Sequence, residues 1–178
     1  MSYYERNLPH WHPEGAALFV TWRLHGTNAH FREIKHDPDP GRSFLAFDRA
    51  LHAAPSGPKW LNEPAVAQCV VDALRFGQRQ LHLYTLIAFY VMPNHVHVLL
   101  DPLAPAPRIT KSIKGFTARS ANQILNRTGE PFWMDESYDR WVRDAEERNK
   151  IVRYTERNPV AAGLVARVED WPWSSAAG

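Results

Sequence analysis

Two histidines separated by a single residue are the first side chains in the sequence that could hold a metal ion. His95 and His97 stand in the segment PNHVHVLL, whose aliphatic and β-branched residues predict a strand. Because successive side chains of a strand point to opposite faces, both imidazoles share one face while Val96 and Val98 face a core. Two imidazoles on one face make half of a metal site. The spacing alone leaves open an alternative, a pair of polar residues on the exposed face of a half-buried strand.

A tyrosine and an asparagine further along the chain form a second polar group. In the segment RDAEERNKIVRYTERNPV, Tyr154 and Asn158 are four residues apart, and Lys150 is four residues before the tyrosine. On a helix these three side chains share one face, which is polar, whereas Ile151 lies on the core face. For the tyrosine taken by itself, the alternative is a ring that packs at the edge of the helix.

Together, the two groups could cleave a phosphodiester bond. A tyrosine hydroxyl can attack phosphorus and form a covalent phosphotyrosine, but its pKa of about 10 means that attack at neutral pH needs help. A divalent ion held by His95 and His97 could polarise the phosphate and stabilise the transition state. Asn158 could add a third, oxygen ligand, so that one helix would position both the ion and Tyr154.

The remaining histidines and the single cysteine show no comparable pattern. His10 and His12 have the same spacing, but the flanking Pro9 and Pro13 argue against a strand. Cys69 is the only cysteine, which rules out an intrachain disulfide and cysteine-based zinc or redox motifs. We predict no function for the other, scattered histidines, which are His25, His30, His36, His52 and His82.

Three elements are expected before the histidine pair. Residues 16–24, AALFVTWRL, predict a strand, and residues 26–43 predict a polar loop. A helix is expected over residues 44–52, before the segment APSGP interrupts it. Asn62 can cap a second helix that has Pro64 in its first turn. The core face of that helix carries Val66, Val70, Ala73 and Leu74.

The histidine pair itself belongs to an expected hairpin. Residues 81–92 and 95–101 predict two strands joined at Pro93-Asn94. A helix is expected over residues 109–126, followed by a short strand near residues 138–142. The apolar face expected for this helix runs through Ile113, Phe116 and Ile124.

End signals bound the helix that carries the tyrosine. Asp144 can cap its first turn, with Glu147 completing a capping box. Pro159 prevents simple continuation, so the helix is expected to end at Arg157 or Asn158. Strands joined by a hairpin and covered by helices predict an α+β fold with an antiparallel sheet, in a single domain over residues 1–178, whose strand order stays open.

Composition fits that single domain. The chain has 178 residues, 44% of them hydrophobic, and no run approaches the ~18 apolar residues of a membrane span. The N-terminus has no apolar core of the signal-peptide kind. Little of the chain follows Trp173, so no longer regulatory segment is expected there. We therefore expect a cytoplasmic protein with no membrane contact.

Charge gives a weaker indication of nucleic-acid binding. The formal net charge is only +2, so local clusters of basic residues matter more than the total. The alternative for such clusters is a set of solvated helix faces. The candidates for phosphate contacts are Lys111, Lys114 and Arg119, and, nearer the tyrosine, Arg140, Arg143 and Arg153.

These segments together resemble a known family. YVMPNHVHVLL looks like the His-hydrophobe-His motif of the HUH endonuclease superfamily. YTERNPVAAGLV followed by EDWPWSSA is similar to the C-terminal signature of REP-associated tyrosine transposases, relatives of the single-tyrosine insertion-sequence transposases. KSIKGFTARSANQIL and WHPEGAALFVTWRL resemble the family's intervening helix and first strand, so the resemblance spans about residues 9–176.

The resemblance implies a fold, a site and a reaction. The fold would be ferredoxin-like, with His95 and His97 as metal ligands on a central strand and Tyr154 as the nucleophile on a helix. The family's polar residue one turn after the tyrosine, which completes the metal site, falls on Asn158. The implied ion is Mg²⁺ or Mn²⁺, although softness rules would favour zinc or a later transition metal for imidazoles. The implied substrate is single-stranded or hairpin DNA, cut to leave a 5′-phosphotyrosine and a free 3′-hydroxyl.

The chain departs from the family pattern in one segment, and alternative functions and oligomeric states stay open. In FWMDESYDR, relatives often carry a glutamine and basic residues where this chain has Met134, Asp135 and Glu136, and acids there would repel phosphate. The expected location within the cytoplasm is the nucleoid. A domesticated DNA-repeat-binding protein without cleavage activity is one alternative function. A metal-dependent hydrolase that uses water is another. Monomer and homodimer both remain possible states.

Overall fold

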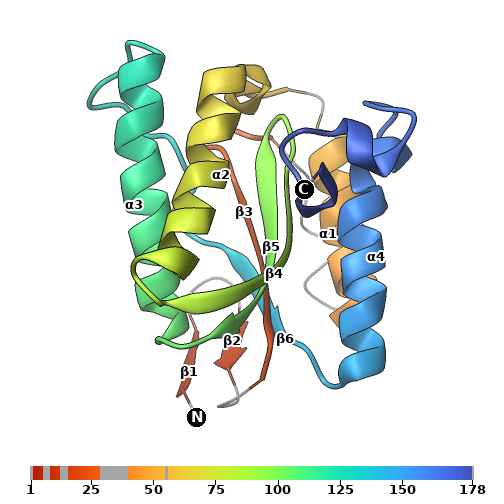
Figure 1. Ribbon diagram of the computed structural model, residues 1–178. Coiled ribbons are helices and arrows are strands. Elements are labelled where there is room, and N and C mark those ends of the chain that lie inside the picture. Colours follow the sequence, from red (N-terminus) through yellow and green to blue (C-terminus); the bar gives the residue numbers. More distant parts are fainter. Residues whose placement is uncertain (1, 6–8, 13–15, 29–39, 55, 178) are drawn as a thin grey trace.

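Four antiparallel strands form the central sheet of the computed structural model, which describes residues 2–5, 9–12, 16–28, 40–54 and 56–177 (Figure 1). The strand order is β4-β5-β3-β6, and every neighbouring pair is antiparallel. The strands are β3 at Leu18–Arg23, β4 at Tyr84–Val91, β5 at His95–Pro102 and β6 at Tyr138–Trp141.

Two helices connect these strands on one side of the sheet. These elements follow the order β3-α2-β4-β5-α3-β6, with α2 at Pro64–Arg79 and α3 at Ala106–Ile124. A further helix at Pro40–His52 is inserted between β3 and α2. β3 and β4 flank β5, which runs antiparallel to both of them. In this arrangement a third strand lies between the two strands of a strand–helix–strand unit. That is the pattern of ferredoxin-like folds. The predicted α+β, ferredoxin-like class is therefore confirmed, and so is the hairpin of β4 and β5.

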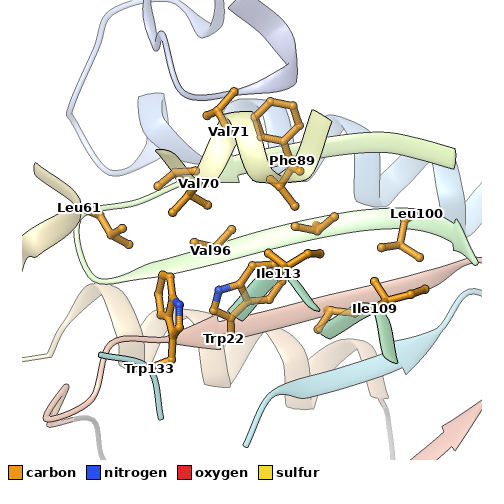
Figure 2. Close-up of a cluster of buried hydrophobic side chains, with 14 of the residues drawn as sticks. Trp22, Leu61, Val70, Val71, Phe89, Val96, Leu100, Ile109, Ile113 and Trp133 are labelled. Carbon is orange, nitrogen blue, oxygen red and sulfur yellow. The ribbon is translucent and has the colours of Figure 1, made fainter. Parts of the chain in front are cut away.

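The larger hydrophobic core lies between the sheet and the helices α2 and α3. Figure 2 shows Trp22 and Val96 of the sheet near Val70 of α2 and Ile113 of α3. Alternate residues of β3 and β5 enter this core, as the period-two pattern requires. They are Leu18, Val20, Trp22, Val96, Val98 and Leu100. The predicted core face of α2 is also confirmed, because Val66, Val70, Ala73 and Leu74 are all buried.

The opposite face of the sheet is covered by α1 at Pro40–His52 and α4 at Ala145–Ala161 (Figure 1). The apolar cluster here is smaller and consists of Phe19, Phe44, Ala88, Leu99, Val142 and Ile151. Buried polar side chains occupy much of the remaining space on this face. Among them are Thr21, Asp48, His95, His97 and Asn158.

Two elements of the N-terminal half differ from expectation. α1 begins at Pro40, inside the predicted loop, while residues 29–39 of that loop lie outside the described residues. Strand β2 at Pro9–His12 pairs with β1 at Ser2–Glu5, so the expectation of no strand at the first histidine pair was wrong. A proline at the first position of a strand is compatible with pairing.

Helix α2 also begins differently. Pro64 occupies the first turn as predicted, but Glu63 is the residue that precedes the helix and its side chain makes no capping hydrogen bond. Asn62 is instead the last residue of the short 3-10 turn η2 at Trp60–Asn62. The predicted cap at Asn62 was therefore wrong by one residue, because this extra turn shifts the start of the helix.

The apolar face predicted for α3 was only partly right. Ile113 is buried, but Phe116 is 51% exposed and Ile124 is 41% exposed. The row that faces the sheet follows spacings of four residues and contains Ile109, Ile113, Thr117 and Ala121. Neither α3 nor any other described helix is long and apolar enough to cross a membrane.

Helix α4 continues through Pro159 to Ala161, so its expected end at Arg157 or Asn158 was wrong. Proline removes one backbone donor, but near the last turn this loss is small, and the N–H of Ala162 still donates to the carbonyl of Asn158 (2.9 Å). At the other end, Asp144 accepts the N–H of Glu147 as predicted. The Glu147 carboxylate accepts the N–H of Arg143 rather than that of Asp144.

The C-terminal signature segment lies along the outer edge of the sheet, beside β4. The N–H of Val91 donates to the carbonyl of Trp173 (2.9 Å), and the indole of Trp171 donates to the carbonyl of Val91 (3.0 Å). The hydroxyl of Ser175 accepts the N–H of Phe89 (3.1 Å). These bonds satisfy backbone groups that an edge strand would otherwise leave open.

Candidate active site

His95 and His97 lie side by side on the face of β5 that α1 and α4 cover. Their ring centroids are 4.8 Å apart, and both side chains are fully buried. The shared orientation predicted from the strand spacing is therefore confirmed, and the alternative of an exposed pair is wrong. The register of the sheet places Thr21 of β3 directly opposite His97.

Hydrogen bonds fix the orientation of both imidazole rings. Thr21 Oγ1 lies 2.6 Å from His97 Nδ1, and Asn94 Oδ1 lies 2.6 Å from His95 Nδ1. The Asn94 amide nitrogen donates to the carbonyl of Leu51 (3.0 Å), so the amide oxygen is the acceptor of a hydrogen bond that His95 Nδ1–H donates. Metal-binding histidines usually have their second ring nitrogen held in this way.

Asp48 of α1 faces both histidines. Its Oδ1 lies 2.8 Å from His97 Nε2 and 3.4 Å from His95 Nε2. The side chain is only 1% exposed, and His52, one turn later on α1, has its Nδ1 3.7 Å from Asp48 Oδ2. Ligand atoms of Asp48, His52 and His95 all lie within 4.8 Å of one another. These three residues therefore form a candidate metal site that reaches the predicted pair.

Helix α4 brings Tyr154 and Asn158 to the same carboxylate. The Tyr154 hydroxyl donates to Asp48 Oδ2, and the Asn158 amide nitrogen donates to that oxygen at 3.0 Å. The ring of Tyr154 packs edge-on against Phe44, with centroids 5.3 Å apart. The structure thus gathers the four residues predicted for catalysis and metal binding around Asp48.

Burial and neighbouring charges set the protonation states of this group. Burial lowers the pKa of His95 to about 4, although Asp48 opposes the shift, so the ring is neutral at pH 7. Burial alone would raise the pKa of Asp48, but His97 and His95 outweigh it and hold that pKa well below its usual range. Burial, followed by the Asp48 charge, raises the pKa of Tyr154 above its ordinary value of 10.0. The tyrosine therefore keeps its proton unless positive charge is added nearby.

Buried atoms without hydrogen-bond partners show that a cation would suit this group. Among the described residues, such atoms include His95 Nε2 and Asn158 Oδ1. An imidazole nitrogen, an amide oxygen and a carboxylate are all ligands that divalent ions accept. The residues present therefore fit a divalent ion, and the donor types by themselves do not select one metal.

Several contributors to the site, Thr21 among them, were not found from the sequence. Asp48 and His52 are four residues apart on α1, a spacing that puts an acid and an imidazole on one helix face. This signal was present, and the structure places His52, for which we predicted no function, in the candidate metal cluster. Asn94 lies next to the histidine pair in the sequence, but its contact with Leu51 depends on the tertiary fold.

The predicted phosphate contacts on α3 do not join this group. Lys111, Lys114 and Arg119 belong to the helix on the other face of the sheet from Tyr154 (Figure 1). Lys114 Nζ donates to the backbone carbonyls of Met134 and Asp135, at 2.8 Å each. Burial lowers the pKa of Lys114 to about 8. This lysine therefore ties α3 to the segment in which the chain departs from the family pattern.

The other three basic candidates lie closer to α4. Arg140 and Arg143 both form ion pairs with Glu147, at 2.9 and 3.1 Å. Arg143 and Arg153 are exposed, whereas Arg140 is largely buried. The exposed members of this group are thus better placed to meet a ligand than Arg140 is.

Comparison with known proteins supports the fold. No family model and no curated protein matches the sequence. Among solved structures, the fold is similar to that of a REP-associated tyrosine transposase bound to a REP hairpin, with a TM-score of 0.56 and 18% identity, over 98% of this chain and 82% of that chain. A protein from Deinococcus radiodurans, provisionally described as a transposase, matches with a TM-score of 0.40 and 16% identity, over 85% and 97% of the two chains. The chain therefore has the fold of the tyrosine transposase family that its motifs resemble.

Proposed function

We propose that the protein is a metal-dependent endonuclease and strand transferase that cuts single-stranded or hairpin DNA with Tyr154. The observation that carries this proposal is the convergence of Tyr154, His95 and His97 on one buried carboxylate. A tyrosine beside paired imidazoles suits nucleophilic attack on a phosphodiester assisted by a divalent ion. The fold match to a transposase bound to a REP hairpin supports hairpin DNA as the substrate class.

The reaction would be a single displacement at phosphorus. The phenolic oxygen of Tyr154 forms a bond to phosphorus, the bond from phosphorus to the 3′ oxygen breaks, and that oxygen leaves as a free 3′-hydroxyl. The phenolic proton would pass to Asp48 Oδ2, to which the hydroxyl donates, and the leaving 3′ oxygen would take up one proton from solvent, so that the proton count balances once Asp48 releases its proton. Bound Mg²⁺ or Mn²⁺ would polarise the phosphate and offset the negative charge that raises the pKa of Tyr154.

The residues that would hold this ion are His95 and His97, whose Nε2 atoms both point to Asp48. Asn158 is the further ligand that the family resemblance implies. Rejoining would follow the same path in reverse, with a 3′-hydroxyl attacking the phosphotyrosine. Such an enzyme would act on DNA in the cytoplasm, at the nucleoid.

A cleavage assay with labelled single-stranded hairpins and Mn²⁺ tests the proposal. We expect the protein to form a covalent adduct with one end of the DNA, visible as a slower band on a denaturing gel. Tyr154→Phe should abolish the adduct and leave hairpin binding largely intact, because only the hydroxyl is removed. Tyr84→Phe is the matched control, since that hydroxyl donates to the carbonyl of Leu74 on the other face of the sheet.

Other outcomes would reject this function. An adduct that persists in Tyr154→Phe would exclude Tyr154 as the nucleophile, and cleavage that continues in a chelator would exclude the metal ion. A DNA shift that never yields cleavage would indicate a repeat-binding protein. Cleaved DNA with no protein attached would indicate a hydrolase that uses water.

A further inference from the structure

The helix α1 places a carboxylate where the histidine pair needs an oxygen ligand. We propose that Asp48 is the carboxylate ligand of the ion that His95 and His97 would hold, and that Asn158 positions this carboxylate instead of binding the ion itself. The inference rests on the proposed function, because it concerns the metal ion of that reaction. The family resemblance implies two histidines and the Asn158 amide as ligands. The proposed ligand set is two histidines and the Asp48 carboxylate.

The first step is the direction of lone pairs at His95. Its Nδ1 donates to Asn94 Oδ1, because the Asn94 amide nitrogen is already committed to the carbonyl of Leu51. A neutral His95 therefore has its lone pair on Nε2, 3.4 Å from Asp48 Oδ1. Two acceptor atoms face each other in a buried space, and His95 Nε2 has no hydrogen-bond partner among the described residues. A cation bound to both atoms would remove this conflict.

The second step is the charge balance of the cluster. Asp48 is 1% exposed, and its ion-pair partners among the described residues are histidines alone, namely His52, His95 and His97. Isolating an ionised carboxylate from water is costly unless a positive charge accompanies it. A divalent cation at Asp48 Oδ1 would supply that charge while the imidazoles stay neutral, which is the form in which they bind metals.

The third step is the orientation of Asn158. Its amide nitrogen donates to Asp48 Oδ2 at 3.0 Å, so the amide group presents a donor to the carboxylate. This contact leaves Asp48 Oδ1 to the histidines, with His97 Nε2 at hydrogen-bond distance (2.8 Å). A metal ion bound to Oδ1 and to both imidazoles would replace that hydrogen bond. Tyr154 also donates to Oδ2. The two α4 side chains therefore hold one oxygen of Asp48 while the other faces the histidine pair.

This ligand set also explains how an imidazole site could use a hard ion. Two imidazoles alone favour zinc or later transition metals, whereas carboxylate oxygens suit Mg²⁺ and Mn²⁺. Two histidines and one carboxylate would leave further ligand positions of the ion open. A phosphate oxygen could occupy one of them, next to the Tyr154 hydroxyl.

Mn²⁺ binding to the full chain, measured without DNA, tests the assignment. Metal-free protein is titrated with Mn²⁺, and the free ion is followed by electron paramagnetic resonance. Asp48→Asn should weaken Mn²⁺ affinity by at least about tenfold, since it removes a ligand rather than a neighbour of one. Asn158→Ala should weaken it less than Asp48→Asn does. Asp72→Asn is the charge-matched control, because Asp72 is an exposed acid of α2 that accepts a hydrogen bond from Gln68.

The opposite results would overturn the assignment. If Asp48→Asn binds Mn²⁺ as tightly as the unaltered protein, or more tightly, the carboxylate is not a ligand and instead competes with the ion. If Asn158→Ala loses more affinity than Asp48→Asn, the amide is the ligand. Circular dichroism in a chelator checks that each variant is folded.

A measurement on the unaltered sequence covers the case in which Asp48→Asn does not fold. Protein with ¹³C-labelled aspartate carboxyl groups is loaded with Mn²⁺ and examined by electron–nuclear double resonance. We expect couplings to both imidazole ¹⁴N and carboxylate ¹³C. Nitrogen couplings without a ¹³C coupling would reject Asp48 and leave the proposed function intact. An absence of any Mn²⁺ binding would reject the metal-dependent function together with the ligand assignment.

Discussion

The two faces of the sheet are built in different ways, and β5 belongs to both. Val96, Val98 and Leu100 enter the apolar core beneath α2 and α3. His95 and His97, on the alternate positions, enter a polar cluster beneath α1 and α4. One face is filled by side chains that need only volume and apolarity, whereas the other depends on the direction of individual lone pairs and protons. The first face should therefore govern stability, and the second should govern metal binding and chemistry.

Leu100→Ala would test the stability side of this comparison and should have the largest effect on folding. Leu100 is 1% exposed, and its truncation should lower the free energy of unfolding by about 2–5 kcal/mol through lost burial and a residual cavity. Urea denaturation measures this change. Mn²⁺ affinity of the folded variant should stay unchanged, because the side chain points away from the histidine pair.

Leu103→Ala is the control for that experiment. Leu103 lies just beyond the same strand but is 67% exposed, so its truncation should change stability by less than about 0.5 kcal/mol. If Leu100→Ala weakened Mn²⁺ binding as strongly as a change at the site, the two faces would not be separable in function.

The same division explains what could be predicted from the sequence. The orientation of His95 and His97 follows from the period of a strand, and that of Tyr154 and Asn158 from the period of a helix. Both are local rules that need no knowledge of the fold. The family resemblance then joined the two groups, and the structure places them at one site.

Asp48 could not be predicted by such rules. It lies 49 residues before His97, 106 before Tyr154 and 110 before Asn158, so its contacts exist only in the folded chain. The spacing of Asp48 and His52 hinted at a polar helix face, but nothing local says that α1 covers the histidines. Likewise, Pro159 ends a helix by local rules, yet α4 continues for two residues beyond it.

Thr21→Val would test the chemical side of the comparison. Thr21 Oγ1 lies 2.6 Å from His97 Nδ1, and valine has nearly the same shape without the hydroxyl. Loss of this bond should free the imidazole ring to turn and leave Nδ1 unpaired. Mn²⁺ affinity should fall by about 10–100-fold, the usual effect of removing a hydrogen-bond partner from a ligating histidine. The free energy of unfolding should fall by only about 1 kcal/mol.

Thr27→Val provides the matched control for the threonine substitution. Thr27 is also buried, but its hydroxyl has no hydrogen-bond partner among the described residues. Its replacement should therefore leave Mn²⁺ affinity unchanged. Equal losses of affinity in the two variants would mean that the Thr21 hydroxyl does not orient His97.

The pH dependence of stability, measured in a chelator, tests the protonation state of the polar cluster. The pKa of His95 is about 4 in the folded protein and about 6.5 in the unfolded chain. Between these values the unfolded chain binds more protons, so the free energy of unfolding falls as the pH falls from 6.5 towards 4. From pH 7 to pH 5 His95 alone should account for a loss of about 1–2 kcal/mol. His52 and His97 should add to this loss, because burial lowers their pKa values too. Asp48 adds nothing in this window, because its carboxyl group is ionised in both states.

Two histidine variants test whether this pH dependence of the free energy of unfolding arises in the polar cluster beneath α1 and α4. His95→Gln should make the fall in urea midpoint between pH 7 and pH 5 shallower, because one of the three histidines of the cluster whose pKa burial lowers is gone. His25→Gln replaces an exposed histidine and should leave the slope as it is. A slope in His95→Gln as steep as in the unaltered protein would mean that His95 does not contribute to the acid sensitivity. The neutral imidazole that binds a metal ion would then not be the form that the fold selects.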